Sequence, residues 1–471
     1  MNQESPRGTP SERLVLFSSG LAVFAVFLDT TIGFVTFPAI GRTFHSVSPS
    51  TVSWVLNAYT LVFAALLIPA GRLADRVGRK KVFLAGVVVF TIGSMACGVA
   101  PNVGVLIATE MLEAVGAALL VPASLALVLQ AFSRERLPVV VAIWGAISAS
   151  AGAAGPTVGA LLVGHLSWRW AFFINLPVGV LSFFLGRAVL PEGREANPGR
   201  LPDPFSVVLI AVGLATAAFA VVRTNEWGWA DARTIGTFLG GVVLISVFVV
   251  RTRVVANPLL SLSMFANRDF AWANLAAFVF SIAFNAMFLG NVLFLTNVWR
   301  YSIVRAGLTI SIGPSIVALT APRFGKLAGR HGQRSLLIPG GLVYAAGAAL
   351  LLARASAQPS FLSVYLPSMV CTALGVAMCF PQFSSAAVAT LPPDQYGTGS
   401  AVVQAVRYFG GTFGVALVIA FTTGHFTVPH FHRVWILIIA CGVCVSMLCS
   451  RLTRRHPASK GRKPMSASAR S

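Results

Sequence analysis

Residues 71–80 read GRLADRVGRK, and residues 325–334 read GKLAGRHGQR. The two decapeptides lie 254 positions apart and share Gly, Leu, Ala, Arg and Gly at matching places. Each one follows a long apolar run and carries several basic residues. A repeated element of this kind indicates a chain made of two related halves, as in transporters built from repeated helix bundles.

The apolar character of the chain extends far beyond these two segments. Of its 471 residues, 56% are hydrophobic and only 10% are charged, and the mean hydropathy is +0.80. A soluble domain carries about 25% charged residues, and a soluble chain could not hide this much apolar surface from water. The composition therefore argues against a soluble enzyme or a nucleic-acid-binding module and favours a membrane protein.

Fourteen apolar runs are bounded by charged residues or by Pro and Gly clusters, and each is long enough to approach the roughly 20 residues that a bilayer span requires. The first run is too long for the apolar region of a signal peptide, so we expect it to remain as an uncleaved helix. The predicted spans are residues 14–40, 51–73, 82–100, 103–132, 138–165, 171–190, 205–222, 234–250, 270–298, 303–321, 335–353, 361–391, 400–423 and 434–449.

The distribution of basic residues sets the expected orientation. An even number of spans puts both termini on one side of the membrane. The predicted loops and tails on that side hold 26 of the 35 Lys and Arg residues, the opposite loops hold eight, and Arg407 lies inside a span. The positive-inside rule then places both termini in the cytoplasm. The net charge of +21 thus follows the topology and needs no nucleic-acid partner.

The spacing of the two decapeptides also predicts how the spans are divided. Six spans per half would separate the copies by about 180–200 residues, and the observed 254 leaves room for two more helices. We therefore expect an all-α polytopic membrane protein with 14 transmembrane helices. Its predicted parts are an N-terminal six-helix bundle (1–200), two inserted transmembrane helices (201–260), a C-terminal six-helix bundle (261–450), and a basic, disordered cytoplasmic tail (451–471) that touches anionic lipid or only anchors the topology.

Several further motifs occur in order along the chain. They are LDTTI at residues 28–32 followed by Pro38; Trp54, Ala58, Tyr59 and Thr60; AGAAGPTVGA at 151–160; WRW at 168–170 and INLP at 174–177; and Arg407 with Gly410, Gly411 and Gly414. Together with residues 71–81 they resemble the major facilitator superfamily, specifically its fourteen-helix drug:proton antiporter branch. The resemblance covers nearly the whole chain and implies a secondary active transporter that exports drugs or antibiotics by alternating access in exchange for protons.

The resemblance implies a conformational latch in the first decapeptide, in a turn that its glycines permit. The charged side chains there can pair with carboxylates or helix ends. The second copy has Gly329 in place of the acid, so we expect the latch mainly at the first copy. The other interpretation is that the basic residues only fix the orientation. The predicted latch residues are Gly71, Asp75, Arg76, Gly78 and Arg79.

The glycine- and proline-rich segment of the fifth span is expected to be a hinge. A proline removes one backbone hydrogen bond and kinks a helix, and small residues at this spacing allow another helix to approach closely. The resemblance implies that Gly152, Gly155, Pro156 and Gly159 form a kinked hinge and seal between the two halves. Ordinary helix packing is the alternative.

Three carboxylates lie inside apolar spans, at Asp29, Glu110 and Glu113. An acid in a membrane span is costly and marks a functional site, and a buried carboxylic acid can hold and release a proton at physiological pH. Glu110 and Glu113 share one helix face. These acids are the candidates for proton or cation coupling, with Arg407 as their countercharge. The alternatives are a structural network with Ser and Thr for the acids and a packing role for Arg407.

The fourth span departs from the pattern of the family, which has Arg followed by Gln-Gly where this chain has Glu110 and then Glu113-Ala114. An acid in place of a base makes the expected cavity more negative and would favour cationic compounds. The missing base also supports a second hypothesis, a dedicated exporter of a single natural product without standard proton coupling. A third hypothesis, a membrane sensor, would require long soluble insertions, which the sequence lacks.

The expected substrate is a small hydrophobic or cationic compound, bound by aromatic and polar side chains. The sequence has no GxxxxGK[ST], HExxH or GxSxG motif and no paired Cys and His, so we predict no ATP site, catalytic centre, metal or cofactor. We expect a monomer in the inner (plasma) membrane, with the substrate, protons and lipid as its partners. The candidate substrate-lining residues are Trp54, Asn57, Tyr59, Phe284, Asn285, Phe288 and Gln382.

Overall fold

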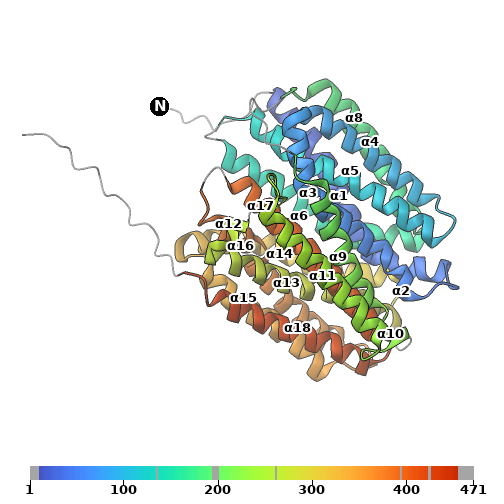
Figure 1. Cartoon of the computed structure of the whole chain (residues 1–471). Coiled ribbons are helices and arrows are strands. Elements are labelled where there is room, and N and C mark those ends of the chain that lie inside the picture. The colour runs from blue at the N-terminus through green and yellow to red at the C-terminus, as the bar shows by residue number, and fades with distance from the viewer. Residues whose placement is uncertain are drawn as a thin grey trace, which may run out of the picture.

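The computed structural model describes residues 10–133, 136–193, 201–259, 262–392, 395–422 and 426–453. Throughout these ranges the chain forms helices joined by short turns, and no strand occurs in them. Figure 1 shows the long helices running side by side through the molecule. The tail that was expected to be disordered lies, from residue 454 onward, outside the described residues.

Fourteen spans in the described part of the chain are long and apolar enough to cross a membrane, which confirms the predicted number. Several are extended by a short helix or a π-helical turn. Their elements are α1 (Pro10–Thr43), α2 (Pro49–Val52) with α3 (Trp54–Val77), α4 (Arg79–Gly98), α5 (Val103–Ala131), α6 (Leu137–His165), α7 (Trp170–Phe173) with α8 (Asn175–Val189), α9 (Pro204–Val222), α11 (Ala232–Val254), α13 (Arg268–Leu293) with η1 (Phe294–Val298), α14 (Ile303–His331), α15 (Arg334–Arg354), η2 (Phe361–Tyr365) with α16 (Leu366–Val388), α17 (Tyr396–Thr422) and α18 (Val428–Cys449). The remaining short helices are α10 (Thr224–Trp227) and α12 (Leu262–Ala266).

Local sequence signals set several helix starts. Asn102 caps α5 by accepting a hydrogen bond from the backbone nitrogen of Val105. Ser302 caps α14 in the same way through Arg305, and Asp203 caps α9 just before a proline at its first position. Such side chains satisfy backbone N–H groups that have no partner at the start of a helix.

The two decapeptides are mostly helical, which corrects the predicted ends of the second and tenth spans at residues 73 and 321. Helix α3 continues to Val77 and α14 continues to His331. The chain turns only at Gly78 and Gly332, whose φ angles are 127° and 83°. Side chains rarely tolerate these angles, so glycine is required at both turns. The two glycines are 254 residues apart, and the repeat seen in the sequence is therefore a repeat in backbone geometry.

The long helices form two groups with a helical hairpin between them. Helices α1 to α8 form one half, and helices α13 to α18 form the other (Figure 1). The hairpin of α9 and α11 lies alongside, and α9 packs against α3 of the first half and α17 of the second. The hairpin therefore bridges the two halves. The halves also contact each other directly, α6 against α14 and α3 against α17.

Candidate functional site

A cavity of 1730 Å³ lies between the two halves. Its wall is formed by α1, α3, α5 and α6 from the first half and by α13, α14, α16 and α17 from the second. The lining reaches the end of the molecule at which α1 begins and α18 ends, through Arg72, Arg79 and Tyr396. We call this end the termini end.

The two halves are in contact at the opposite end. The rings of Phe34 on α1 and Phe288 on α13 lie 4.9 Å apart between centroids. Thr157 on α6 donates a hydrogen bond of 2.6 Å to Ser311 on α14. A Cβ atom on Gly307 of α14 would lie only 2.5 Å from the carbonyl oxygen of Pro156. The cavity therefore extends to the termini end and is closed at the other end.

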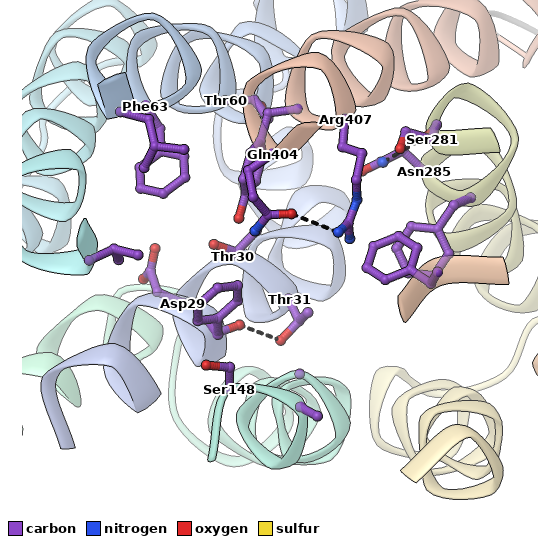
Figure 2. Close-up of a pocket in the computed structure, with 18 of the residues that line it drawn as sticks. Asp29, Thr30, Thr31, Thr60, Phe63, Ser148, Ser281, Asn285, Gln404 and Arg407 are labelled. Atoms are coloured by element: carbon purple, nitrogen blue, oxygen red, sulfur yellow. Dashed lines mark hydrogen bonds between the residues drawn. The ribbon is translucent and has the colours of Figure 1, made fainter. Parts of the chain in front are cut away.

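The three predicted intramembrane acids lie near one another in the first half. Asp29 and Glu110 line the cavity, although their exposed fractions are only 8% and 6%. Glu113 is completely buried and does not belong to the lining. Each of the three is thus largely withdrawn from the open space. Figure 2 shows Asp29 on α1, next to Thr30 and Thr31.

Asn175 on α8 joins two of these acids, a role that the sequence alone does not predict. Its Nδ2 lies 3.0 Å from Asp29 Oδ1, 3.4 Å from Glu113 Oε1 and 3.0 Å from the Ser94 hydroxyl. Among the described residues, the second oxygen of Glu113 and the amide oxygen of Asn175 are buried without a hydrogen-bond partner. One amide therefore holds two carboxylates together. The sequence signal that points to this residue is a polar Asn within an apolar run, in the INLP segment.

Arg407 lies on the other side of the cavity, on α17. It is half-buried, and its Nη1 donates a hydrogen bond of 2.6 Å to Gln404 Oε1 (Figure 2). Its guanidinium carbon lies 3.3 Å from the centroid of the Phe380 ring. No carboxylate in the described ranges forms an ion pair with it. The structure thus brings Arg407 to the same cavity as Asp29 and Glu110 but does not pair it with an acid.

The candidate substrate-lining residues divide into two groups. Tyr59, Phe284, Asn285 and Phe288 line the cavity. The other three, Trp54, Asn57 and Gln382, lie outside the lining. The ring centroid of Trp54 lies 6.1 Å from that of Phe219 on α9, and Asn57 and Gln382 are buried. Further polar residues of the lining include Thr30, Thr31, Thr60, Ser148, Gln404 and Tyr408.

The predicted latch residues lie at the termini end of the cavity. Asp75 and Arg79 form an ion pair of 2.9 Å across the turn at Gly78, and both line the cavity together with Gly71. The carboxylate thereby lies beside the first turn of α4, where a negative charge is favourable. Gly78 is buried, and Arg76 is exposed and lies outside the lining.

The predicted hinge residues pack against α1. Helix α6 continues through Pro156, which lies inside it. A Cβ atom on Gly155 would clash with the Thr31 hydroxyl, and one on Gly159 would lie 3.1 Å from Ile32. Gly152 lines the cavity. These residues let α1 and α6 approach closely, and Pro156 lies at the contact between the halves.

Comparison with known proteins gives consistent results over most of the chain. A family model described as Major Facilitator Superfamily matches residues 20–415 and again residues 273–468. The multidrug resistance protein Stp of Mycobacterium tuberculosis is 33% identical over 427 residues, covering 90% of this chain and 79% of that protein. The tetracenomycin C resistance and export protein of Streptomyces glaucescens is 29% identical, covering 87% and 76%. The puromycin resistance protein pur8 of Streptomyces alboniger is 32% identical, covering 86% and 80%.

Solved structures share the fold at low sequence identity. A D-xylose-proton symporter superposes with a TM-score of 0.67 at 15% identity, covering 93% of this chain and 97% of the other. The peptide transporter POT in complex with sulfate gives a TM-score of 0.66 at 18% identity, covering 96% and 97%. At these identities, the likeness shows a shared fold.

Proposed function

Because the chain belongs to the major facilitator superfamily and is a multi-pass membrane transporter rather than an enzyme, we propose that it exports small amphipathic compounds from the cell by alternating access in exchange for protons. In alternating access, two halves rock around a fixed site so that the site opens to one side of the membrane at a time. We further propose that it acts as a monomer in the cell membrane, surrounded by lipid and without ATP.

The observation that carries this proposal is the cavity itself. It lies between two related halves, extends to one end of the molecule, and is closed at the other by contacts such as that between Thr157 and Ser311. The excess of basic residues on the termini side favours a cytoplasmic location for that end. The structure then corresponds to the state that takes up a compound from the cytoplasm.

The compounds are inferred from the lining and from the relatives. The wall combines Phe284, Phe288 and Tyr59 with the polar Asn285, a mixture that suits amphipathic molecules. The relatives are named for resistance to or export of several antibiotics, tetracenomycin C and puromycin among them. We therefore propose drug-like and antibiotic-like substrates for this chain.

Proton coupling is proposed for the buried acids of the first half. Asp29 and Glu110 face the cavity, and Glu113 connects to it through Asn175. Charged carboxylates are costly at this depth in a membrane, and a protonated carboxylate avoids that cost. The binding and release of a proton at these groups would tie the conformational change to the proton gradient.

The experiment is a susceptibility panel in an efflux-deficient host, with puromycin, tetracenomycin C and ethidium as compounds. We expect the wild-type chain to raise resistance to at least one of them, and Asp29→Asn, Glu110→Gln and Glu113→Gln to abolish most of that effect at equal expression. Glu226→Gln is the matched control, because Glu226 is exposed and pairs with Arg223 outside the cavity. Everted vesicles energised by respiration should release protons when the compound is added.

A dedicated exporter without standard proton coupling remains the second proposal, because Glu110 occupies the place where the family normally has a base. A narrow resistance profile, together with normal flux in Glu110→Gln and transport that persists after collapse of the pH gradient, would favour it. Loss of flux in that variant and in a collapsed gradient would exclude it.

A further inference from the structure

The charges around the cavity are not equally available to a bound molecule. The exposed fraction of Asp29 is 8%, that of Glu110 is 6%, and that of Glu113 is zero. Asp29 and Glu113 also accept hydrogen bonds from Asn175, which turns them toward the interior of the first half. The sequence predicts a cavity dominated by acids, but in the structure these acids are the least accessible charges of its middle section.

Arg407 is the charge that the middle section of the cavity does present, whereas the charged lining residues Arg72, Asp75 and Arg79 lie at the termini end. It is half-buried and lies in the lining, and its one hydrogen bond among the described residues goes to the neutral Gln404. Its Nε is buried without a hydrogen-bond partner in the same set of residues. A guanidinium offers five N–H donors in a planar fork. An uncompensated cation inside a membrane protein is costly, and a bound anion would compensate it.

A row of aromatic rings extends from this arginine across the cavity. The guanidinium stacks on Phe380, whose ring centroid lies 5.0 Å from that of Phe284. Phe284 lies 6.2 Å from Phe288, and Phe288 lies 4.9 Å from Phe34 of the opposite half. All four rings belong to the cavity lining. We call them the phenylalanine row.

The two features define the shape and charge of a matching ligand. Flat aromatic molecules stack favourably on phenylalanine rings, and a carboxylate or phenolate oxygen matches a guanidinium through charge-assisted hydrogen bonds, two of them in the case of a carboxylate. From this geometry we propose that Arg407 and the phenylalanine row form a subsite for planar aromatic compounds that carry an ionised oxygen. The proposal rests on the export function above and names one class of its substrates.

Three pyrene probes of the same size test the subsite directly. They are 1-pyrenecarboxylate, the neutral 1-pyrenemethanol and the cationic 1-pyrenemethylammonium, and binding to the purified full-length protein in lipid nanodiscs is followed by pyrene fluorescence. We expect the wild-type protein to bind the carboxylate tightest and the ammonium weakest. Arg407→Gln should weaken carboxylate binding about tenfold or more, the usual size of a charge-assisted contact, and should change binding of the alcohol less than threefold. The affinity of Arg407→Lys for the carboxylate should lie between the affinities of the wild type and Arg407→Gln.

The chain supplies a matched control in Arg305. This arginine also stacks on an aromatic ring, 3.8 Å from the centroid of Tyr301, but it is exposed and lies outside the cavity lining. Arg305→Gln should therefore leave the affinities of all three probes unchanged. The order of the three probes in the wild-type protein requires no variant, so it tests the subsite even where Arg407→Gln does not fold.

Two results would overturn the subsite. One is a wild-type protein that binds the ammonium probe as tightly as the carboxylate. The other is an Arg407→Gln protein that has the melting temperature of the wild type and either keeps the wild-type affinity for the carboxylate or loses affinity for all three probes equally. Flux in proteoliposomes separates this failure from that of the export proposal. If the probes bind as expected but none is transported in energised vesicles, export is refuted and the subsite stands. If a probe is transported but Arg407→Gln binds the carboxylate as tightly as the wild type, only the subsite is refuted.

Discussion

Among single residues, Asn175 shows how the structure adds to the list of acids. It is buried on α8, and its amide nitrogen donates to Asp29 on α1, Glu113 on α5 and the Ser94 hydroxyl on α4. Removal of a buried donor leaves its acceptors unsatisfied, which costs about 1–3 kcal/mol per group. The asparagine therefore positions the acids as well as stabilising the first half.

We predict that Asn175→Ala lowers the free energy of unfolding by about 1–3 kcal/mol and reduces export at least tenfold at equal expression. Thermal unfolding of the purified protein and flux in vesicles measure the two effects. Asn274→Ala is the control, because Asn274 is equally buried but donates to the backbone of its own helix, at Phe270, outside the cavity lining. Wild-type flux in Asn175→Ala would contradict the positioning role.

Sequence reasoning located the charged residues but not their partners. Asp29, Glu110 and Arg407 stand out because charge is rare in apolar spans, and all three line one cavity. The pairing of Asp29 with Asn175 connects residues 146 positions apart, and no local periodicity encodes such a contact. The position of Asn57 outside the cavity lining has the same origin, because the rotation of α3 about its axis depends on packing against neighbours that the sequence pattern does not specify.

At the scale of helices, α1 and α6 fit together because Gly155 has no side chain. A Cβ atom there would overlap the Thr31 hydroxyl, which already donates to the backbone of α1. We predict that Gly155→Ala destabilises the protein by about 1–3 kcal/mol, as overpacking does, and sharply reduces export. Gly240→Ala on α11 should have little effect, because a Cβ atom at that position meets nothing within 4 Å. Thermal unfolding of both variants decides the point.

An ion pair joins the two helices of the inserted hairpin, α9 and α11, at the termini end. Arg251 on α11 donates to both oxygens of Asp203, at 2.6 and 3.1 Å, and Asp203 also caps α9 through Ser206. The guanidinium beside Asp203 holds the pKa of that carboxyl well below its usual range. A lowered pKa means that the charged form stabilises the folded protein above the ordinary pKa of about 4, and this stabilisation disappears as the pH falls through the lowered value.

We predict that Asp203→Asn lowers the melting temperature at pH 7 and that the difference from wild type narrows as the pH is lowered below about 4. Asparagine retains the ability to cap α9, so the difference reports the charge. Melting curves between pH 3 and pH 7 provide the test. Asp231→Asn is the control, since the Asp231–Arg233 pair is exposed and local and such pairs contribute little. An Asp203→Asn difference that stays constant over this range would contradict the explanation.

For the molecule as a whole, the number of spans and the repeat were predictable, because both rest on short-range patterns of hydrophobicity and on the two decapeptides. The direction in which the cavity extends was not. It depends on which ends of the two halves touch, here through residue pairs such as Thr157 with Ser311 and Phe34 with Phe288. Side-chain contacts between segments more than 150 residues apart leave no periodic signal in a single sequence.

The closed end provides the last prediction. Alternating access requires the contact between α6 and α14 to open, so a covalent bond across it should stop transport. Thr157 and Ser311 have hydroxyl oxygens 2.6 Å apart, and we predict that a Thr157→Cys/Ser311→Cys protein is inactive after oxidation and regains export on reduction. Each single cysteine variant should transport before and after oxidation. Full export by a protein whose cross-link is verified by mass spectrometry would show that the two halves do not separate at this end.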